Sequence, residues 1–395
     1  MNTTSSPARP GFLRAACCRG IGFAALAGVP AFAQTLSAIH VPPRFKRPAA
    51  DTDEGGLWAL MDREEARVRR SPLTIHEQRL RTYLQDLVCR LAGDHCPDIR
   101  VYPVRVPHFN AMMAPNGMMV VWSGLLLRVE NEAQLAAVLG HEMGHYLERH
   151  QVEQLRAAES HALVAQFVGL VGGVGTFLGQ VGLAASLYAF SREHESRADR
   201  MGVRLMVQAG YDPHEAVKVW DNLLGELKVT GGKNAGKTGD ILDTHPATAE
   251  RRDELRALAG DLGGRKGRDS LRQAIAPLRF GWIQDEIKRG QYEESLVLFD
   301  RLVADDPQDA DVLFARGEVR RLRGDGTDGE RALADLGAAA QMPAARADVF
   351  RSLGLLYKQR NDPQAAQQAF QRYLALAPQA PDAPMVRSYL TEWKP

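Results

Sequence analysis

The sequence predicts a mainly α-helical fold with one small β-sheet in its first part and α-helical repeats at its C-terminal end. Long segments place apolar residues three and four positions apart, which is the spacing of an amphipathic helix. Alternation of β-branched and other residues, which is typical of strands, is confined to 99–106 and its near neighbours. After about residue 277, helical segments follow one another with similar residues at similar places, which indicates stacked helical pairs.

The composition is that of an ordinary globular protein large enough for two domains. The chain has 395 residues, of which 45% are apolar and 25% are charged. This length excludes a small protein that depends on disulfides for its stability. The formal net charge of +1 gives no reason to expect nucleic acid as a partner.

The first 33 residues have the pattern of a secretory signal peptide. They contain three arginines, no acidic residue, an apolar stretch over 21–32 and the cleavage pattern Ala31-Phe32-Ala33. The apolar stretch is too short to cross a bilayer as a helix. We therefore expect an exported protein that is cleaved after residue 33, with a disordered or anchored N-terminus as the alternative.

The cysteines agree with export. Cys17 and Cys18 lie in the predicted signal peptide, which leaves only Cys89 and Cys96 in the mature chain. A single nearby pair in an oxidising compartment is a candidate disulfide. It would join the end of a helix to the start of the next strand, and two unreactive thiols are the alternative.

In the first part of the chain, helices should both precede and follow the strands along the sequence. In chain order the expected elements are helices over 56–70 and 74–91, strands over 99–106, 110–113 and 118–122, and one long helix over 131–156. The segment 162–188 is apolar and long enough to span a membrane, but several glycines interrupt it. We expect a buried or interfacial helical pair there, and membrane contact through 162–188 stays open.

The sharpest motif is His141-Glu142-Met143-Gly144-His145, which lies inside the long predicted helix. A helix turns by about 100° per residue, so His141 and His145 lie on one face and can bind one zinc ion. Glu142 flanks the same site, where it can accept a proton from water. Gly144 keeps one side of the helix narrow enough for another element to approach. A surface helix with two unrelated histidines is the alternative.

A second motif completes a metal site. Glu195 and Asp199 are four residues apart on a later predicted helix, so their carboxylates share a face. One carboxylate can be the third metal ligand, and the other can hold a ligating histidine by its second ring nitrogen. Two histidines and one carboxylate are the ligands of a catalytic zinc site, so we expect one Zn²⁺ per chain. We assign no role to His150 and His194, because both lie off the ligand faces.

The two motifs together resemble those of the gluzincin peptidases of the HtpX, Oma and CAAX-prenyl-protease type. The resemblance spans about residues 75–255 and implies a zincin-like α+β peptidase domain. It implies that His141, His145 and Glu195 bind zinc, that Glu142 is the general base, and that Asp199 orients a ligand.

The resemblance extends to two further regions. Asn110 and Ala111 match the family's strand above the zinc helix, which pairs with a bound peptide. His245, in the sequence Thr244-His245-Pro246, matches a histidine that lies near the metal in the periplasmic relatives. His245 could stabilise the oxyanion or occupy the open metal position and keep the enzyme latent. A lone loop histidine can also be purely structural.

The C-terminal region resembles tetratricopeptide repeats, most clearly over 347–378. The residues at favoured positions of that repeat are Phe350, Leu353, Gly354, Tyr357, Ala366, Phe370 and Pro378. Two weaker units precede it. One helical pair cannot bury its apolar face alone, so the units should stack.

These observations predict five segments and one leading function. The segments are a signal peptide (1–33), an N-terminal arm and helix (34–73), a zinc metallopeptidase domain (74–260), a linker (261–276) and tetratricopeptide-like repeats (277–395). With its export signal and repeats, the whole chain resembles the periplasmic β-barrel-assembly-enhancing proteases. This implies an exported, periplasmic endopeptidase for the quality control of envelope proteins, whose repeats recruit protein clients or the outer-membrane assembly machinery. A chaperone or scaffold with a latent peptidase site is the alternative.

Overall fold

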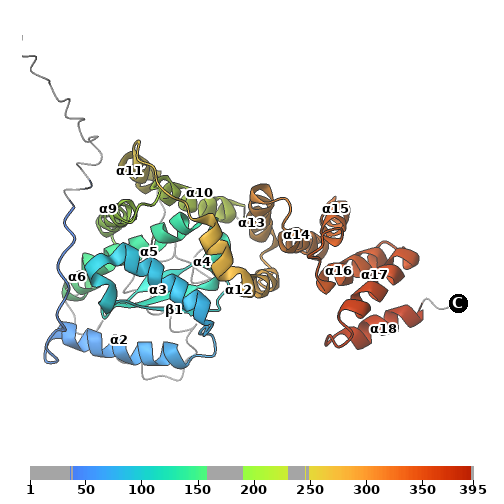
Figure 1. Ribbon diagram of the computed structural model, residues 1–395, viewed down its shortest axis with the longest axis horizontal. Helices are drawn as coiled ribbons and strands as arrows, with labels where there is room; N and C mark the ends of the chain where they lie inside the picture. Colours follow the sequence, from blue (N-terminus) through green and yellow to red (C-terminus); the bar gives the residue numbers. More distant parts are fainter. Residues whose placement is uncertain (1–35, 37–38, 158–189, 230–244, 246–248, 393–395) are drawn as a thin grey trace, which may run out of the picture.

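The computed structural model describes residues 36, 39–157, 190–229, 245 and 249–392. The predicted signal peptide and the apolar segment 162–188 lie outside the described residues. Within the described part, the fold is mainly helical with one small sheet and C-terminal helical repeats, which confirms the predicted fold class (Figure 1). In the described ranges, no helix is both long and apolar enough to cross a bilayer.

The sheet has three strands in the order β1-β3-β2. They are β1 (Arg100–Val104), β2 (Ala111–Met113) and β3 (Met118–Trp122). β1 runs parallel to β3, and β2 runs antiparallel to it. The turn between β2 and β3 needs Gly117, because its φ is 86° and a Cβ there would lie 2.0 Å from the carbonyl oxygen of Asp98. The turn therefore lies tightly against the segment that leads into β1.

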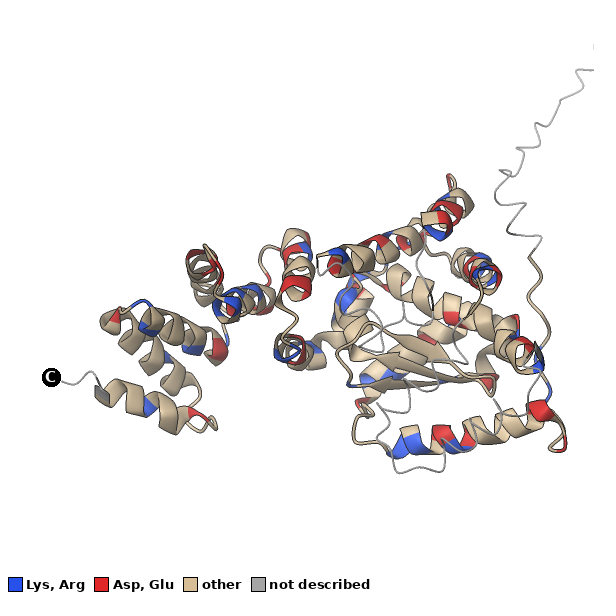
Figure 2. Cartoon of the chain, turned by 180° about the vertical axis from the view of Figure 1, so that it is seen from behind, with Lys and Arg blue, Asp and Glu red and all other residues tan. Residues whose placement is uncertain are grey.

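Helices cover both faces of the sheet. α2 (Asp53–Arg70) packs on one face, and α3 (Gln78–Ala92) and the later helix α5 pack on the other (Figure 1). Successive residues of β3 belong to different apolar clusters, as expected of a strand whose two faces are both covered. In Figure 2 the strands are mostly tan, and the charged residues are concentrated on the outer helices.

A disulfide follows α3. The structure joins Cys89, in the last turn of α3, to Cys96 in the short 3₁₀ helix η1 (Gly93–Asp98). The bridge closes the chain reversal that leads into β1. The N-terminal arm packs nearby, where the ring of Phe45 meets those of His95 and Tyr146 edge to face.

The prediction of one long helix over 131–156 is wrong, because the helix is interrupted at Glu148 and Arg149. After α4 (Ser123–Arg128), the chain forms α5 (Glu132–Leu147) and a separate helix α6 (His150–Ala157). Asn131 caps α5 by accepting a hydrogen bond from the backbone N–H of Gln134. The break lies at Arg149, whose φ of 59° is left-handed and cannot continue a right-handed helix.

Among the described residues between α6 and residue 260, three further helices are present. They are α9 (Arg192–Gln208), α10 (His214–Lys228) and α11 (Ala249–Ala259). Ser191 caps α9 by accepting a hydrogen bond from the backbone N–H of His194. α9 lies along α5, and α10 and α11 pack beside them (Figure 1).

The repeat region begins on a continuous helix. α12 (Arg268–Lys288) begins inside the predicted linker (261–276) and continues past Pro277. The predicted linker is therefore irregular only before Arg268. The helices that follow are α13 (Tyr292–Asp305), α14 (Ala310–Arg323), α15 (Asp328–Ala340), α16 (Ala347–Gln359), α17 (Pro363–Leu376) and α18 (Ala383–Glu392). They extend away from the sheet as an arm of packed helices (Figure 1).

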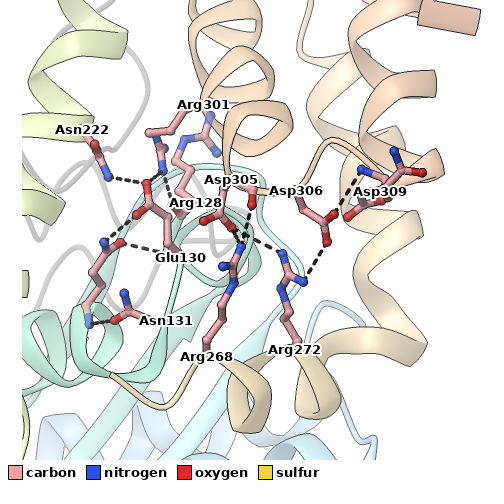
Figure 3. Close-up of polar contacts among 12 residues, drawn as sticks. Arg128, Glu130, Asn131, Asn222, Arg268, Arg272, Arg301, Asp305, Asp306 and Asp309 are labelled. Atoms are coloured by element: carbon pink, nitrogen blue, oxygen red, sulfur yellow. Dashed lines mark hydrogen bonds and ion pairs between the residues drawn. The ribbon is translucent and has the colours of Figure 1, made fainter. Parts of the chain in front are cut away.

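Buried and half-buried charges join the two parts. Arg128 of α4 donates to Glu226 of α10 and to Glu286 of α12, at 2.8 and 2.9 Å. Arg301 of α13 donates to Glu226 at 2.8 Å. It also donates to Glu130 at 3.0 Å, a contact that Figure 3 shows. These ion pairs connect α4 and α10 to α12 and α13, so they fix the first repeat helices against the first part of the chain.

Candidate metal centre

The site forms where α5 and α9 approach closely. A Cβ on Gly144 would lie 2.6 Å from the carbonyl oxygen of Ala198, and one on Gly202 would lie 2.9 Å from the backbone nitrogen of His141. Side chains larger than hydrogen at Gly144 and Gly202 would therefore push the helices apart. The prediction that Gly144 admits another element is confirmed, and that element is the helix that carries Glu195 and Asp199.

The predicted ligands come together in one buried place. Nε2 of His141 lies 3.1 Å from Nε2 of His145, and the Glu195 carboxylate lies 3.4 Å from the former and 3.5 Å from the latter. All three side chains are at most 2% exposed. Two nitrogen atoms and a carboxylate thus surround one point.

His245 is the fourth member of this group. Its Nδ1 lies 2.9 Å from Glu195 and 3.3 Å from Nε2 of His141, and the residue is 2% exposed. Its Nε2 lies 3.5 Å from the carboxylate of Glu142. The neighbouring residues Thr244 and Pro246 lie outside the described residues. The structure thus brings His245 into the same cluster as the three predicted ligands.

Asp199 and Arg251 hold the site from behind. Nδ1 of His141 lies 2.8 Å from Asp199, and since an ionised carboxylate can only accept, His141 donates this hydrogen bond. Arg251 of α11 donates to both oxygens of Asp199 and pairs with Glu195 at 2.7 Å. Its guanidinium also lies over the ring of Trp220, 5.2 Å from the centroid. Nδ1 of His141 is thereby engaged by Asp199, which leaves Nε2 as the ring nitrogen that can bind a metal.

The electrostatics of this cluster suit a cation. Burial disfavours a charged His141, but the carboxylates of Asp199 and Glu195 outweigh it and raise its pKa to about 9. Burial and the neighbouring charge of His141 hold the pKa of His145 well below its ordinary value. Imidazole nitrogens and a carboxylate are the donors that zinc prefers, and converging lone pairs repel unless a cation lies between them. His141, His145, Glu195 and His245 therefore fit a zinc ion.

Glu142 lies beside this cluster and is 1% exposed. Burial raises the pKa of its carboxyl above the ordinary value, although the charges of His245 and His141 oppose the shift. Its Oε1 has no hydrogen-bond partner among the described residues. A buried carboxylate with a raised pKa and a spare oxygen is suited to proton transfer.

Two residues that were assigned no role from the sequence contact the ring of His145. The ring of Phe190 stacks on His145, with centroids 3.8 Å apart. His150 is completely buried, and its Nδ1 lies 2.9 Å from Nδ1 of His145. The expectation that His150 lies away from the ligands is wrong, because it assumed one continuous helix. Burial, followed by the charge of His194, lowers the pKa of His150 to about 3.

Arg251 and Trp220 were also missed. No local spacing connects Arg251 to the two motifs, because it reaches the site from a helix that packs there only in the folded chain. Its position six residues after His245 is the one signal in the sequence, and it is weak.

The predicted peptide-binding residues lie at the edge of the sheet. Asn110 and Ala111 are buried at the start of β2. The carbonyl of Asn110 accepts from Trp122, and the N–H of Ala114 donates to Met118, so Ala111 directs its backbone groups away from β3, toward the edge that no described strand covers. On the same edge, the carbonyl of Met113 accepts a hydrogen bond from the side chain of Gln151, at 3.1 Å.

The fold and the site define a zincin-type metallopeptidase domain. A helix with the sequence His-Glu-x-x-His lies beneath a small sheet, and a second helix supplies the third donor, which is a carboxylate. Comparison with known proteins agrees. Residues 74–259 match peptidase family M48, and residues 327–391 match a tetratricopeptide repeat family. The chain thus carries an M48 peptidase domain and a tetratricopeptide repeat region.

Individual relatives are similar over part of the chain. The mitochondrial metalloendopeptidase OMA1 of Schizosaccharomyces pombe is 34% identical over 155 residues, which cover 38% of this chain and 44% of the relative. OMA1 of Arabidopsis thaliana is 35% identical over 42% of this chain and 33% of its own length. The beta-barrel assembly-enhancing protease of Escherichia coli K12 is 25% identical over 59% of this chain and 49% of the relative. The chain thus spans less than half the length of these relatives.

Proposed function

We propose that this chain is an exported zinc-dependent endopeptidase in which His141, His145 and Glu195 hold one zinc ion. The observation that carries the proposal is the convergence of these three donors within 3.5 Å of one another, next to the buried carboxylate of Glu142. The match to a metallopeptidase family supports it independently.

In this proposal Glu142 is the general base and acid. Zinc, when bound, polarises the carbonyl of the scissile peptide bond and makes water more acidic. Glu142 accepts the proton of the attacking water and passes it to the leaving amine, for which its raised pKa suits it. Asp199 acts by holding His141 in the orientation that presents Nε2, and Arg251 balances the charge of Asp199 and Glu195.

The substrate would bind as an extended peptide along the outer edge of β2, on the side away from β3. The outward backbone groups of Ala111 can form ladder hydrogen bonds with such a peptide, as in other cases of strand addition to a sheet edge. Further along, the carbonyl of Met113 is engaged by Gln151, so we propose that peptide pairing ends there.

The position of His245 supports a second part of the proposal, which is that the peptidase is latent. Its Nδ1 lies 2.9 Å from Glu195 and 3.3 Å from His141, which suits a fourth metal donor. A fourth protein donor would occupy the position that water and substrate need. The peptidase would then work only when His245 moves away. A chaperone or scaffold whose peptidase site is normally shut is the second candidate function, and the position of His245 is the observation that favours it.

The proposed cellular role rests on the N-terminal sequence pattern and on the name of a relative. The signal-like pattern over 1–33 supports export, and a relative is named as enhancing β-barrel assembly. We therefore propose a periplasmic role in the quality control of envelope proteins, with the repeats over 277–395 recruiting clients or the outer-membrane assembly machinery. The OMA1 relatives are named as mitochondrial, so the location rests on the signal-like pattern and not on the peptidase domain.

Zinc content and casein hydrolysis of the purified protein test the proposal. Wild type and His245→Ala are each compared with the same chain carrying Glu142→Gln. We expect about one zinc per chain in all four proteins, and a loss of hydrolysis of at least about 10²–10⁴-fold with Glu142→Gln. Absence of zinc from wild type would contradict the proposed site. Zinc without hydrolysis, in wild type and His245→Ala alike, would favour the chaperone or scaffold.

A further inference from the structure

The second zinc-site histidine has a buried neighbour that the proposed mechanism does not use. His150 is 0% exposed, and its Nδ1 lies 2.9 Å from Nδ1 of His145. The part of the chain that the structure describes offers no hydrogen-bond partner for its other nitrogen, Nε2. The hydrogen bond to His145 is thus the polar contact that the structure gives to this ring.

One proton must lie between the two Nδ1 atoms, and its position decides what His145 can do. If His145 donates, its Nε2 carries a lone pair that faces the cluster. If His150 donates, a neutral His145 carries its proton on Nε2 and cannot bind a metal through that atom. Ligation by Nε2 of His145 therefore requires His150 to be the acceptor.

The fold brings His150 to this position by breaking the helix. In a continuous helix, residues five apart differ by roughly 140° around the axis, so His150 would face away from His145. The left-handed φ of 59° at Arg149 redirects the chain. Arg149 is held there by an ion pair with Glu54 of α2 and lies over the ring of Phe45, 5.3 Å from the centroid. The N-terminal arm and α2 thus secure the break.

The other side of His150 is held by packing. The ring of His194 stacks on it, with centroids 4.4 Å apart and planes at 23°, and Nε2 of His194 lies 3.0 Å from Glu153. His150, Glu153 and His194 are close enough to suggest a second metal site. The lone pairs of two stacked rings run nearly parallel and do not converge on one ion. We therefore interpret the ring of His194 as packing support for the ring of His150 and not as a metal ligand.

We propose that His150 is a positioning residue for His145: its Nδ1 accepts the Nδ1–H of His145, so that Nε2 of His145 keeps its lone pair for the metal. The inference rests on the proposed zinc site. The two zinc histidines are then oriented by different chemistry. A carboxylate holds His141, and a neutral imidazole holds His145 without adding a further negative charge to a site that already contains Glu142, Glu195 and Asp199.

The test measures zinc affinity by chelator competition on the full chain. His150→Phe keeps an aromatic ring against His194 but cannot accept a hydrogen bond. His150→Asn places an amide oxygen close to the position of Nδ1 and can accept one. We expect the Phe variant to bind zinc about 10–100-fold more weakly than wild type and the Asn variant to stay within about threefold of it. If the Phe variant does not fold, His150→Leu takes its place.

Thermal unfolding of the metal-free proteins separates positioning from packing. We expect similar melting temperatures for the metal-free wild type and both variants, because the inferred role concerns the metal-bound site. The inference is overturned if both variants keep the wild-type zinc affinity, or if both lose affinity equally. A wild type without zinc overturns the proposed site itself, which is a distinguishable result.

Discussion

Glu286 and Glu142 are both almost completely buried, yet their surroundings shift the pKa of the carboxyl in opposite directions. Glu286, in α12, is 0% exposed and accepts from Arg128 and Arg289 at 2.9 Å and from Ser295 at 2.8 Å. Its pKa is lowered, because the two arginines outweigh the effect of burial. Glu142, in α5, is 1% exposed, and burial raises its pKa.

The difference teaches how the same residue type serves structure in one place and chemistry in another. At Glu286 the fold supplies the compensating cations, so the charge is fixed and the helices are joined. At Glu142, Oε1 has no hydrogen-bond partner among the described residues, and burial raises the pKa of the carboxyl, which suits proton transfer. Glutamine substitutions at the two positions should therefore have opposite consequences.

The largest effect on stability is expected from Glu286→Gln. The change leaves Arg128 and Arg289 without their shared buried anion, which should lower the free energy of unfolding by about 3 kcal/mol. Urea denaturation measures this. Hydrolysis per folded molecule should stay near that of wild type, since Glu286 does not touch the metal cluster. An unchanged urea midpoint would show that the interface charges do not hold the two parts together.

The next effect concerns His245, the proposed fourth donor of the metal cluster. His245→Ala removes the fourth donor, so casein hydrolysis per bound zinc should rise about tenfold if the competent form is a minor population. Zinc affinity should fall at the same time, because one donor is lost. A fall in hydrolysis at full zinc occupancy would instead assign His245 to stabilising the oxyanion.

A smaller effect is expected for the stability of metal-free Glu142→Gln. The pKa of Glu142 is raised in the folded state, so its ionised form opposes folding at neutral pH. Removing the charge should leave the free energy of unfolding unchanged or increase it by up to about 1 kcal/mol. Urea denaturation in the presence of a chelator measures this. A clear loss of stability would mean that Glu142 is held like Glu286.

The smallest effect is a dependence on pH. Because the folded-state pKa of Glu286 lies below its ordinary value of 4.5, its contribution to stability is complete above that value and is lost as the pH falls below it. The difference in unfolding free energy between wild type and Glu286→Gln should therefore be constant between about pH 6 and about pH 8 and shrink below about pH 4.5. A difference that grows on acidification would reverse the assigned direction of the pKa shift.

Much of the metal cluster could be predicted because its spacing is local. A four-residue separation fixes which face of a helix the side chains occupy, so the pairing of His141 with His145 and of Glu195 with Asp199 follows from helix geometry. The role of Gly144 was predictable for the same reason. The repeats were predictable because the same small and aromatic residues recur at a fixed interval.

The remainder depends on tertiary packing. No glycine or proline marks the break at Arg149, which α2 and the N-terminal arm stabilise through Glu54 and Phe45. The contact between His150 and His145 was therefore not predictable. Arg251 was missed because it reaches Asp199 only after α11 packs beside α9. The continuous helix α12 was not predicted, because the glycine-rich composition before Arg268 and the proline at position 277 conceal it.

The most direct test of the account is anomalous diffraction at the zinc absorption edge from crystals of the purified chain. The account predicts one strong peak, within about 2.0–2.3 Å of Nε2 of His141, Nε2 of His145 and the carboxylate of Glu195. No peak at these three residues, or a peak only at His150, Glu153 and His194, would contradict it.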